Sequence, residues 1–240
     1  MPVLNGKHVV VVGGSSGIGL AVASLAQTEG AELTLVSRTE EKLRAAAASL
    51  GGKPSIIAVD ASDPQALGEA FSGIRSVDHL VCTSGGSFPS EFFSENGYAT
   101  LRETQDAKLG TQANSVQAML PHLAEHASIV FTSGASGRLI SAKSSALATT
   151  NIAIEALAKT LALELQPIRV NVVAPGIVDT SAYDEMDDGD RKAMFDKMAK
   201  MLPVGRVGAP EDLARAYVAC LTNPYMTGSV VDVDGGAAIA

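Results

Sequence analysis

Residues 9–19 constrain the fold more than any other part of the chain. They read VVVVGGSSGIG, four β-branched residues followed by a glycine-rich loop. Four consecutive valines suit a strand that is buried on both faces, as in a parallel sheet. An Ala/Leu-rich helical pattern follows over residues 18–27, so backbone N–H groups and the positive end of a helix would meet at the loop. This order predicts a pyrophosphate site, because a Cβ on these glycines would hold the backbone away from the phosphates.

Strand and helix patterns then alternate along the whole chain, in the βαβ order of a doubly wound sheet. The apolar runs are 9–12, 33–36, 55–59, 79–82, 128–132, 169–173 and 229–233, and the later helical patterns are 40–50, 64–71, 101–123, 146–164 and 210–220. We therefore predict an α/β fold, a Rossmann-type doubly wound parallel sheet of about seven strands with helices on both faces. It would form a single domain over residues 1–240. The segment at about 181–203 is rich in Asp, Lys and Met, and we expect it to form a lid-like insertion.

The composition agrees with a single undivided domain. A chain of 240 residues with 46% hydrophobic content can bury a large core. A net charge of −8 and scattered Lys and Arg argue against a nucleic-acid surface. Cys82 and Cys220 fit no disulfide framework or metal spacing, so we expect buried thiols and no metal. The N-terminus has no signal pattern and no apolar run reaches the ~18 residues of a membrane span, so we expect a cytoplasmic protein without a membrane segment.

Several motifs, in the same order and over nearly the entire chain, resemble those of the short-chain dehydrogenase/reductase family. The family's Thr-Gly-x-x-x-Gly-x-Gly falls on residues 12–19, with Val12 in place of the threonine. Residues 59–61 resemble the element that binds the adenine, residues 175–180 the Pro-Gly-x-x-x-Thr stretch beside the nicotinamide, and residues 227–236 the C-terminal ending. The resemblance implies a nicotinamide dinucleotide held by Gly13, Ser15, Ser16, Gly17, Ile18, Gly19, Asp60, Ala61, Ser84, Gly85, Asn151, Pro175, Gly176, Val178 and Thr180.

The end of the second predicted strand bears on the choice of cofactor. An acidic side chain there would bond both ribose hydroxyls of NAD and repel a 2′-phosphate. This chain has Ser37 at that place and Arg38 beside it. A guanidinium can pair with a phosphate and stack on adenine, so we expect NADP(H) to be preferred over NAD(H). A solvated arginine at the start of a helix is the alternative.

The predicted catalytic residues depart from the family's pattern. In the family, a tyrosine exchanges a proton with the substrate, and a lysine one helical turn later lowers the tyrosine pKa and binds the nicotinamide ribose. A serine holds the carbonyl, and an asparagine on the preceding long helix helps to organise a relay water. Residues 153–165 look so typical that the register needs no gap, and Leu147 then stands at the tyrosine position and Asn151 at the lysine position. Leucine cannot transfer a proton, and asparagine brings no charge.

Two further positions refine this prediction. Ser133 matches the family serine, and counting back from residues 120–121 places Lys108 where the asparagine is usual. Lys108 and Asn151 have thus exchanged residue types, which would keep one ammonium on the opposite helix. A buried lysine there can hold an anionic substrate or act as an acid, whereas a surface lysine on a long helix would do neither. We expect Ser133, Lys108 and Asn151 to be the catalytic residues, with Tyr183 as another candidate proton donor.

Three functions remain open. The first is an NADP(H)-dependent oxidoreductase for a carbonyl or hydroxyl substrate, with a non-standard or weakened proton relay. The second is a catalytically silent protein that senses nucleotide or regulates a partner, and the third is an enzyme without net hydride transfer. The retained nucleotide motifs favour the first two. The resemblance also implies a homodimer or homotetramer that pairs through the long helices predicted at 101–123 and 146–164.

Overall fold

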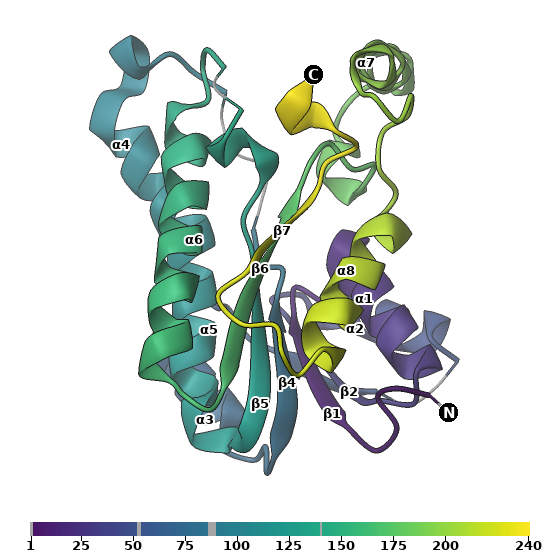
Figure 1. Cartoon of the computed structure of the whole chain (residues 1–240), viewed down its shortest axis with the longest axis vertical. Coiled ribbons are helices and arrows are strands. Elements are labelled where there is room, and N and C mark those ends of the chain that lie inside the picture. The colour runs from purple at the N-terminus through teal and green to yellow at the C-terminus, as the bar shows by residue number, and fades with distance from the viewer. Residues whose placement is uncertain (1, 52–53, 86–89, 140) are drawn as a thin grey trace.

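Seven parallel strands form one sheet in the order β3-β2-β1-β4-β5-β6-β7 (Figure 1). The computed structural model describes residues 2–51, 54–85, 90–139 and 141–240. The strands are β1 His8–Val12, β2 Glu32–Ser37, β3 Ser55–Ala58, β4 Val77–Cys82, β5 Leu123–Thr132, β6 Arg169–Pro175 and β7 Val230–Val233. Every pairing is parallel, and the strand order reverses between β1 and β4. The predicted doubly wound α/β fold is confirmed. Ligands of such sheets bind beyond the carboxyl ends of the strands at this reversal.

The valine run of β1 is buried because helices cover both faces of the sheet. Val9 and Val11 belong to a core with α1 (Gly17–Thr28), α2 (Glu40–Ser49) and α8 (Pro210–Thr222). Val10 and Val12 belong to a second core with α3 (Pro64–Phe71), α5 (Thr111–Met119) and α6 (Ser145–Glu164). Successive side chains of a strand point to opposite faces, so an uninterrupted apolar run is what a two-sided core requires.

The helix predicted over residues 101–123 is in fact four consecutive elements. They are α4 Phe93–Gln105, a π-helical turn Asp106–Gly110, α5 Thr111–Met119 and a 3-10 turn Leu120–His122. Pro121 lies in that 3-10 turn and cannot continue the helical hydrogen bonds, so β5 begins directly afterwards at Leu123. The π-helical turn contains Lys108, whose side chain it turns into the protein. Such turns occur often at functional sites.

The segment predicted to be a lid forms a 3-10 turn, Ser181–Tyr183, and helix α7, Asp188–Met201. None of the described α7 residues is buried, and α7 lies beside the C-terminal end, beyond the carboxyl edge of the sheet (Figure 1). Gly235 and Gly236 pack on the segment that follows α7, where a Cβ would lie 2.8 Å from Val204 Cγ2 and 2.7 Å from Pro203 Cγ. The C-terminal end therefore supports the base of the predicted lid.

The structure also bears on the expectations for the two cysteines and for membrane-spanning helices. Cys82 and Cys220 are free and buried, as predicted, and burial raises the pKa of the Cys220 thiol to about 11. Among the described helices, α6 alone has the length and hydropathy of a membrane span. It packs against α4 and β6, and the core helices of proteins without a membrane segment share this composition.

Candidate functional site

The glycine loop closes so tightly that side chains would not fit. A Cβ at Gly19 would lie 2.3 Å from the Gly13 carbonyl oxygen, and one at Gly13 would lie 2.6 Å from Thr83 Oγ1. Gly13 and Gly17 also have positive φ angles of 88° and 51°, which favour glycine. Helix α1 begins at Gly17, and its N-cap Ser16 makes no side-chain capping bond. The first N–H groups of α1 thus lie at a loop where Gly13, Gly17 and Gly19 carry no Cβ, which fits a pyrophosphate.

The end of β2 carries the adenosine side of the predicted site. The Ser37 hydroxyl is buried and has no hydrogen-bond partner among the described residues. Arg38 next to it is exposed, and no hydrogen bond or ion pair within the described chain holds its guanidinium. Its charge contributes to lowering the pKa of Asp60, after the larger effect of hydrogen bonds from Ser62. A hydroxyl without a hydrogen-bond partner, next to a guanidinium without an ion pair among the described residues, fits a phosphate on the ribose.

One buried amide that the sequence did not single out bonds to the ends of both β4 and β5. Gln112 Nε2 donates to the Thr132 carbonyl at 3.0 Å, and Gln112 Oε1 accepts from the Thr132 N–H at 2.9 Å. The same Nε2 group lies 3.4 Å from the carbonyl of Ser84, which follows β4. The Ser84 hydroxyl lies 3.1 Å from Oγ1 of Thr111, which is on the same helix as Gln112. These bonds position the residues around Ser84 and Gly85 at the carboxyl edge, next to the glycine loop.

The Pro-Gly stretch after β6 meets the glycine loop from the other side. A Cβ at Gly176 would lie 2.6 Å from the Asp234 Cα, so only glycine fits there. A Cβ at Gly17 would lie 3.4 Å from the Thr180 Cβ, and the Ser181 hydroxyl donates to Ser16 Oγ at 3.2 Å. Arg191 of α7 pairs with Asp179 and thereby fixes this stretch to the predicted lid. The predicted cofactor residues from β1, β4 and β6 therefore converge on one edge.

Lys108 is the central charge of the predicted catalytic region. Its side chain is buried, and its Nζ donates to the Ser133 carbonyl at 2.7 Å and to Asn151 Oδ1 at 2.6 Å. Burial lowers the pKa of Lys108 to about 8, because water no longer solvates the ammonium. The structure thus brings together Lys108 and Asn151, the two positions with exchanged residue types. Leu147 lies one helical turn before Asn151 on α6 and offers no polar atom.

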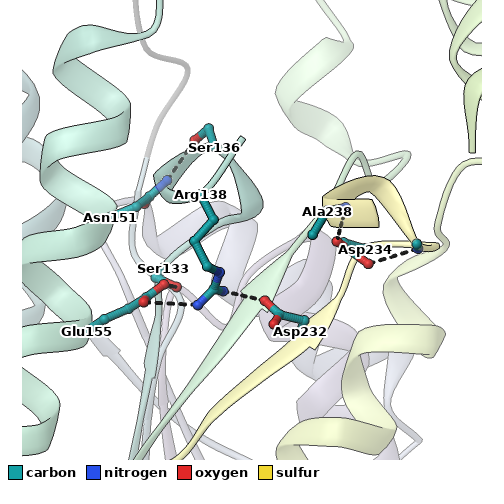
Figure 2. Close-up of polar contacts among 9 residues, drawn as sticks. Ser133, Ser136, Arg138, Asn151, Glu155, Asp232, Asp234 and Ala238 are labelled. Carbon is teal, nitrogen blue, oxygen red and sulfur yellow. Dashed lines mark hydrogen bonds and ion pairs between the residues drawn. The ribbon is translucent and has the colours of Figure 1, made fainter. Parts of the chain in front are cut away.

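Asn151 connects Lys108 to the turn that follows β5. Its Nδ2 donates to Ser136 Oγ at 2.8 Å (Figure 2). This 3-10 turn, Ala135–Gly137, approaches α6 so closely that a Cβ at Gly134 would lie 2.9 Å from Asn151 Nδ2. At this turn, the backbone of Gly134 and the hydroxyl of Ser136 therefore face the Asn151 side chain.

The Ser133 side chain points elsewhere, toward the ion pair of Glu155 and Arg138 (Figure 2). Its Oγ donates to Glu155 Oε1 at 3.0 Å, and Arg138 donates to Glu155 Oε2 at 3.0 Å and pairs with Asp232 of β7. The Glu155 side chain is only 7% exposed. Ser133 therefore touches Lys108 through its carbonyl, while its hydroxyl serves a network that joins β5, α6 and β7. The sequence did not indicate this network, because no local pattern marks partners so far apart: Arg138 lies 17 residues from Glu155 and 94 residues from Asp232.

Tyr183, the other candidate donor, packs on the predicted lid. Its ring meets the Phe195 ring edge-on, with centroids 5.3 Å apart. Burial and the nearby Asp179 raise the pKa of the Tyr183 phenol, which makes it a weaker acid than a free tyrosine.

Comparison with known proteins decides the family. A family model described as enoyl-(acyl carrier protein) reductase matches residues 12–238. The chain belongs to the short-chain dehydrogenase/reductase family. A 3-oxoacyl-[acyl-carrier-protein] reductase of Mus musculus is 31% identical over 236 residues, which cover 96% of this chain and 97% of the relative. The members of this family bind a nicotinamide cofactor, and the cradle described above fits one.

Two solved proteins match over nearly their whole length. A small-chain dehydrogenase solved in complex with NADPH is 35% identical, with a TM-score of 0.86, and the match covers 98% of this chain and all of the other. An L-sorbose reductase from Gluconobacter frateurii, solved with NADPH and L-sorbose, is 28% identical with a TM-score of 0.88 over the full length of both chains. The fold is thus shared with proteins of known structure.

Proposed function

We propose that this short-chain dehydrogenase/reductase is an NADP(H)-dependent oxidoreductase for a carbonyl or hydroxyl substrate, with Lys108 supplying the proton. The observation that carries the proposal is the buried Lys108 ammonium in contact with Asn151 at the carboxyl edge of the sheet. It replaces the family's Tyr-x-x-x-Lys pair, whose positions the sequence register assigns to Leu147 and Asn151.

NADP(H) is supported over NAD(H) by the end of β2. The orphaned Ser37 hydroxyl and the uncommitted Arg38 offer a donor and a cation where a 2′-phosphate would lie. Two similar solved proteins hold NADPH. Gly13, Ser15, Ser16, Gly17, Ile18 and Gly19 would hold the pyrophosphate, Asp60, Ala61, Ser84 and Gly85 the adenosine side, and Asn151, Pro175, Gly176, Val178 and Thr180 the nicotinamide side.

Bound NADPH would supply the hydride, and the protein would orient the cofactor and the substrate and supply the proton. As the carbonyl is reduced, negative charge develops on its oxygen, and the Lys108 ammonium stabilises that charge and releases a proton to it. A pKa of about 8 suits this task, because the group is protonated at neutral pH and yet more acidic than a solvated lysine. The Ser133 carbonyl and Asn151 Oδ1 hold the ammonium in place.

We also propose a cytoplasmic homodimer or homotetramer. Large apolar side chains lie exposed on α4 and α6, which pack side by side: Tyr98 at 69%, Ile152 at 44% and Leu163 at 72% exposed. A second copy of the chain would cover this surface. The segment at about 181–203 would close over the substrate as a lid.

The test is NADPH oxidation with a panel of ketones, aldehydes and keto acids, alongside calorimetry with NADPH and NADH. We expect tighter binding of NADPH and slow turnover of at least one carbonyl. Lys108→Met should lower turnover by about 100-fold or more and leave NADPH affinity unchanged. Lys159→Met on the exposed face of α6 is the matched control. NADPH binding without any turnover would support the silent sensor instead. Equal affinity for both nucleotides would contradict the cofactor assignment.

A further inference from the structure

One chain of hydrogen bonds runs from Lys108 through Asn151 to Ser136. Lys108 Nζ donates to Asn151 Oδ1 at 2.6 Å, and Asn151 Nδ2 donates to Ser136 Oγ at 2.8 Å. Lys108 and Asn151 are both buried, at 8% and 1% exposed. Water therefore competes little with these bonds, and each bond polarises the next.

The direction of this chain is fixed by chemistry. A lysine ammonium has only donors, so the atom of Asn151 that faces it must be the carbonyl oxygen. A reversed amide would place Nδ2 against the ammonium. The Nδ2 group therefore faces Ser136, and because an amide N–H can only donate, the Ser136 oxygen must accept. The hydroxyl proton of Ser136 takes no part in these hydrogen bonds, and no described residue accepts it.

Ser133 and Ser136 differ in what they can offer a ligand. The Ser133 proton is donated to the Glu155 carboxylate, and Ser133 is 2% exposed. Ser136 is half-buried, and it lies on the 3-10 turn beyond the carboxyl end of β5. Its hydroxyl ends a polarised chain with an unused donor at the edge where the family binds its substrates.

We propose that the Ser136 hydroxyl donates a hydrogen bond to the reacting oxygen of the substrate. This inference rests on the proposed function. Asn151 is then a positioning residue, which turns the Ser136 proton outward. Lys108 remains the source of the proton, and its charge strengthens the Ser136 donor through the Asn151 amide. The ligand class that fits is one with an oxygen that accepts a hydrogen bond, such as a ketone or aldehyde.

The first test compares variants that remove, keep or redirect the hydrogen bond of the Ser136 hydroxyl. Ser136→Ala should lower kcat/KM for a reduced ketone by about 100-fold, as the loss of one donor to an oxyanion does, while Ser136→Thr keeps a hydroxyl and most of the rate. Asn151→Asp keeps a partner for Lys108, but its carboxylate would accept the Ser136 proton and turn it away from the substrate. We expect Asn151→Asp to lose as much activity as Ser136→Ala. Ser141→Ala, at an exposed hydroxyl of the same connection, is the matched control.

A second readout does not depend on turnover. Cyclohexanone with a ¹³C-labelled carbonyl is added to the protein with NADP⁺, and the carbonyl stretch is measured by infrared difference spectroscopy. The native protein should shift the stretch to lower wavenumber than in buffer, and Ser136→Ala and Asn151→Asp should remove most of that shift. If no carbonyl is ever reduced but the shift and its loss are observed, the proposed function fails and the Ser136 contact stands. An unshifted band in the native protein, or the same band in native and Ser136→Ala protein, overturns the inference. So does a loss of kcat/KM below about threefold in Ser136→Ala when native turnover is measurable.

Discussion

The buried Lys108 ammonium should make the stability of this fold rise with pH on the alkaline side. Burial lowers its folded-state pKa from 10.5 to about 8. An unfolded chain solvates the lysine and keeps the ordinary value, so between pH 8 and 10.5 the unfolded state binds more protons than the folded state. The free energy of unfolding therefore increases with pH in that window. Below pH 8 both states hold the proton, and the folded state carries the full cost of the buried charge.

The size of the effect follows from the pKa shift. One pKa unit corresponds to about 1.4 kcal/mol, so the full cost is about 3 kcal/mol, of which about 2 kcal/mol should disappear between pH 7 and pH 9.5. Lys108→Met removes the titrating group and fills similar space. Other groups with raised pKa values, such as the buried Tyr217 phenol, are common to both proteins and cancel in the difference.

The assay is urea unfolding of native and Lys108→Met protein at several pH values from 7 to 9.5. We expect the native free energy of unfolding to gain about 2 kcal/mol relative to the variant over this range. Lys159→Met, at an exposed lysine of α6, should show no such pH-dependent difference. A native-minus-variant difference that stays constant within about 0.5 kcal/mol from pH 7 to 9.5 would refute a buried ammonium with a lowered pKa.

Other predictions follow from the same structure. Arg38→Ala should weaken NADPH binding by about 10- to 100-fold in calorimetry and leave NADH unchanged, because a charged hydrogen-bond partner of the 2′-phosphate is lost; an equal loss for both nucleotides would speak against this contact. Arg138→Ala should lower the free energy of unfolding by about 2 kcal/mol or more, since it leaves the Glu155 carboxylate buried without its cation, and a change near zero would mean that the pair is not formed. Gly19→Ala should abolish nucleotide binding, because its Cβ would overlap the Gly13 carbonyl, and binding retained in calorimetry would contradict the cradle. Light scattering should report a homodimer or homotetramer that Leu163→Arg shifts toward the 24.6 kDa monomer, whereas a native monomer at micromolar concentration would overturn the assembly.

The fold could be predicted from the sequence because its signals are local and periodic. The valine run of β1, the glycine loop and the alternation of apolar runs with helical patterns each depend on neighbouring residues. The π-helical turn at Lys108 could not be predicted, because an apolar pattern marks the buried face of a helix and not the place where its hydrogen bonds change from i→i+4 to i→i+5. The predicted helix over 101–123 therefore had the wrong boundaries.

The candidate site divides in the same way. Register counting placed Lys108 and Asn151 in exchanged positions, and the structure brings the two side chains into hydrogen-bond contact. The direction of the Ser133 hydroxyl depends on Glu155, and the exposure of the Ser136 hydroxyl depends on the turn after β5, so no sequence pattern could separate the two serines. Side-chain direction at a strand end is a tertiary property.

The pH dependence of kcat/KM tests the central claim most directly, because it asks whether Lys108 is the acid of the reaction. The measurement compares NADPH-dependent carbonyl reduction by native protein and by Lys108→Met from pH 6 to 10. An acid must be protonated to act, so the native rate should fall as pH rises through about 8, and the residual rate of the variant should show no fall there. A native profile without a fall near pH 8, or the same fall in Lys108→Met, would contradict the account.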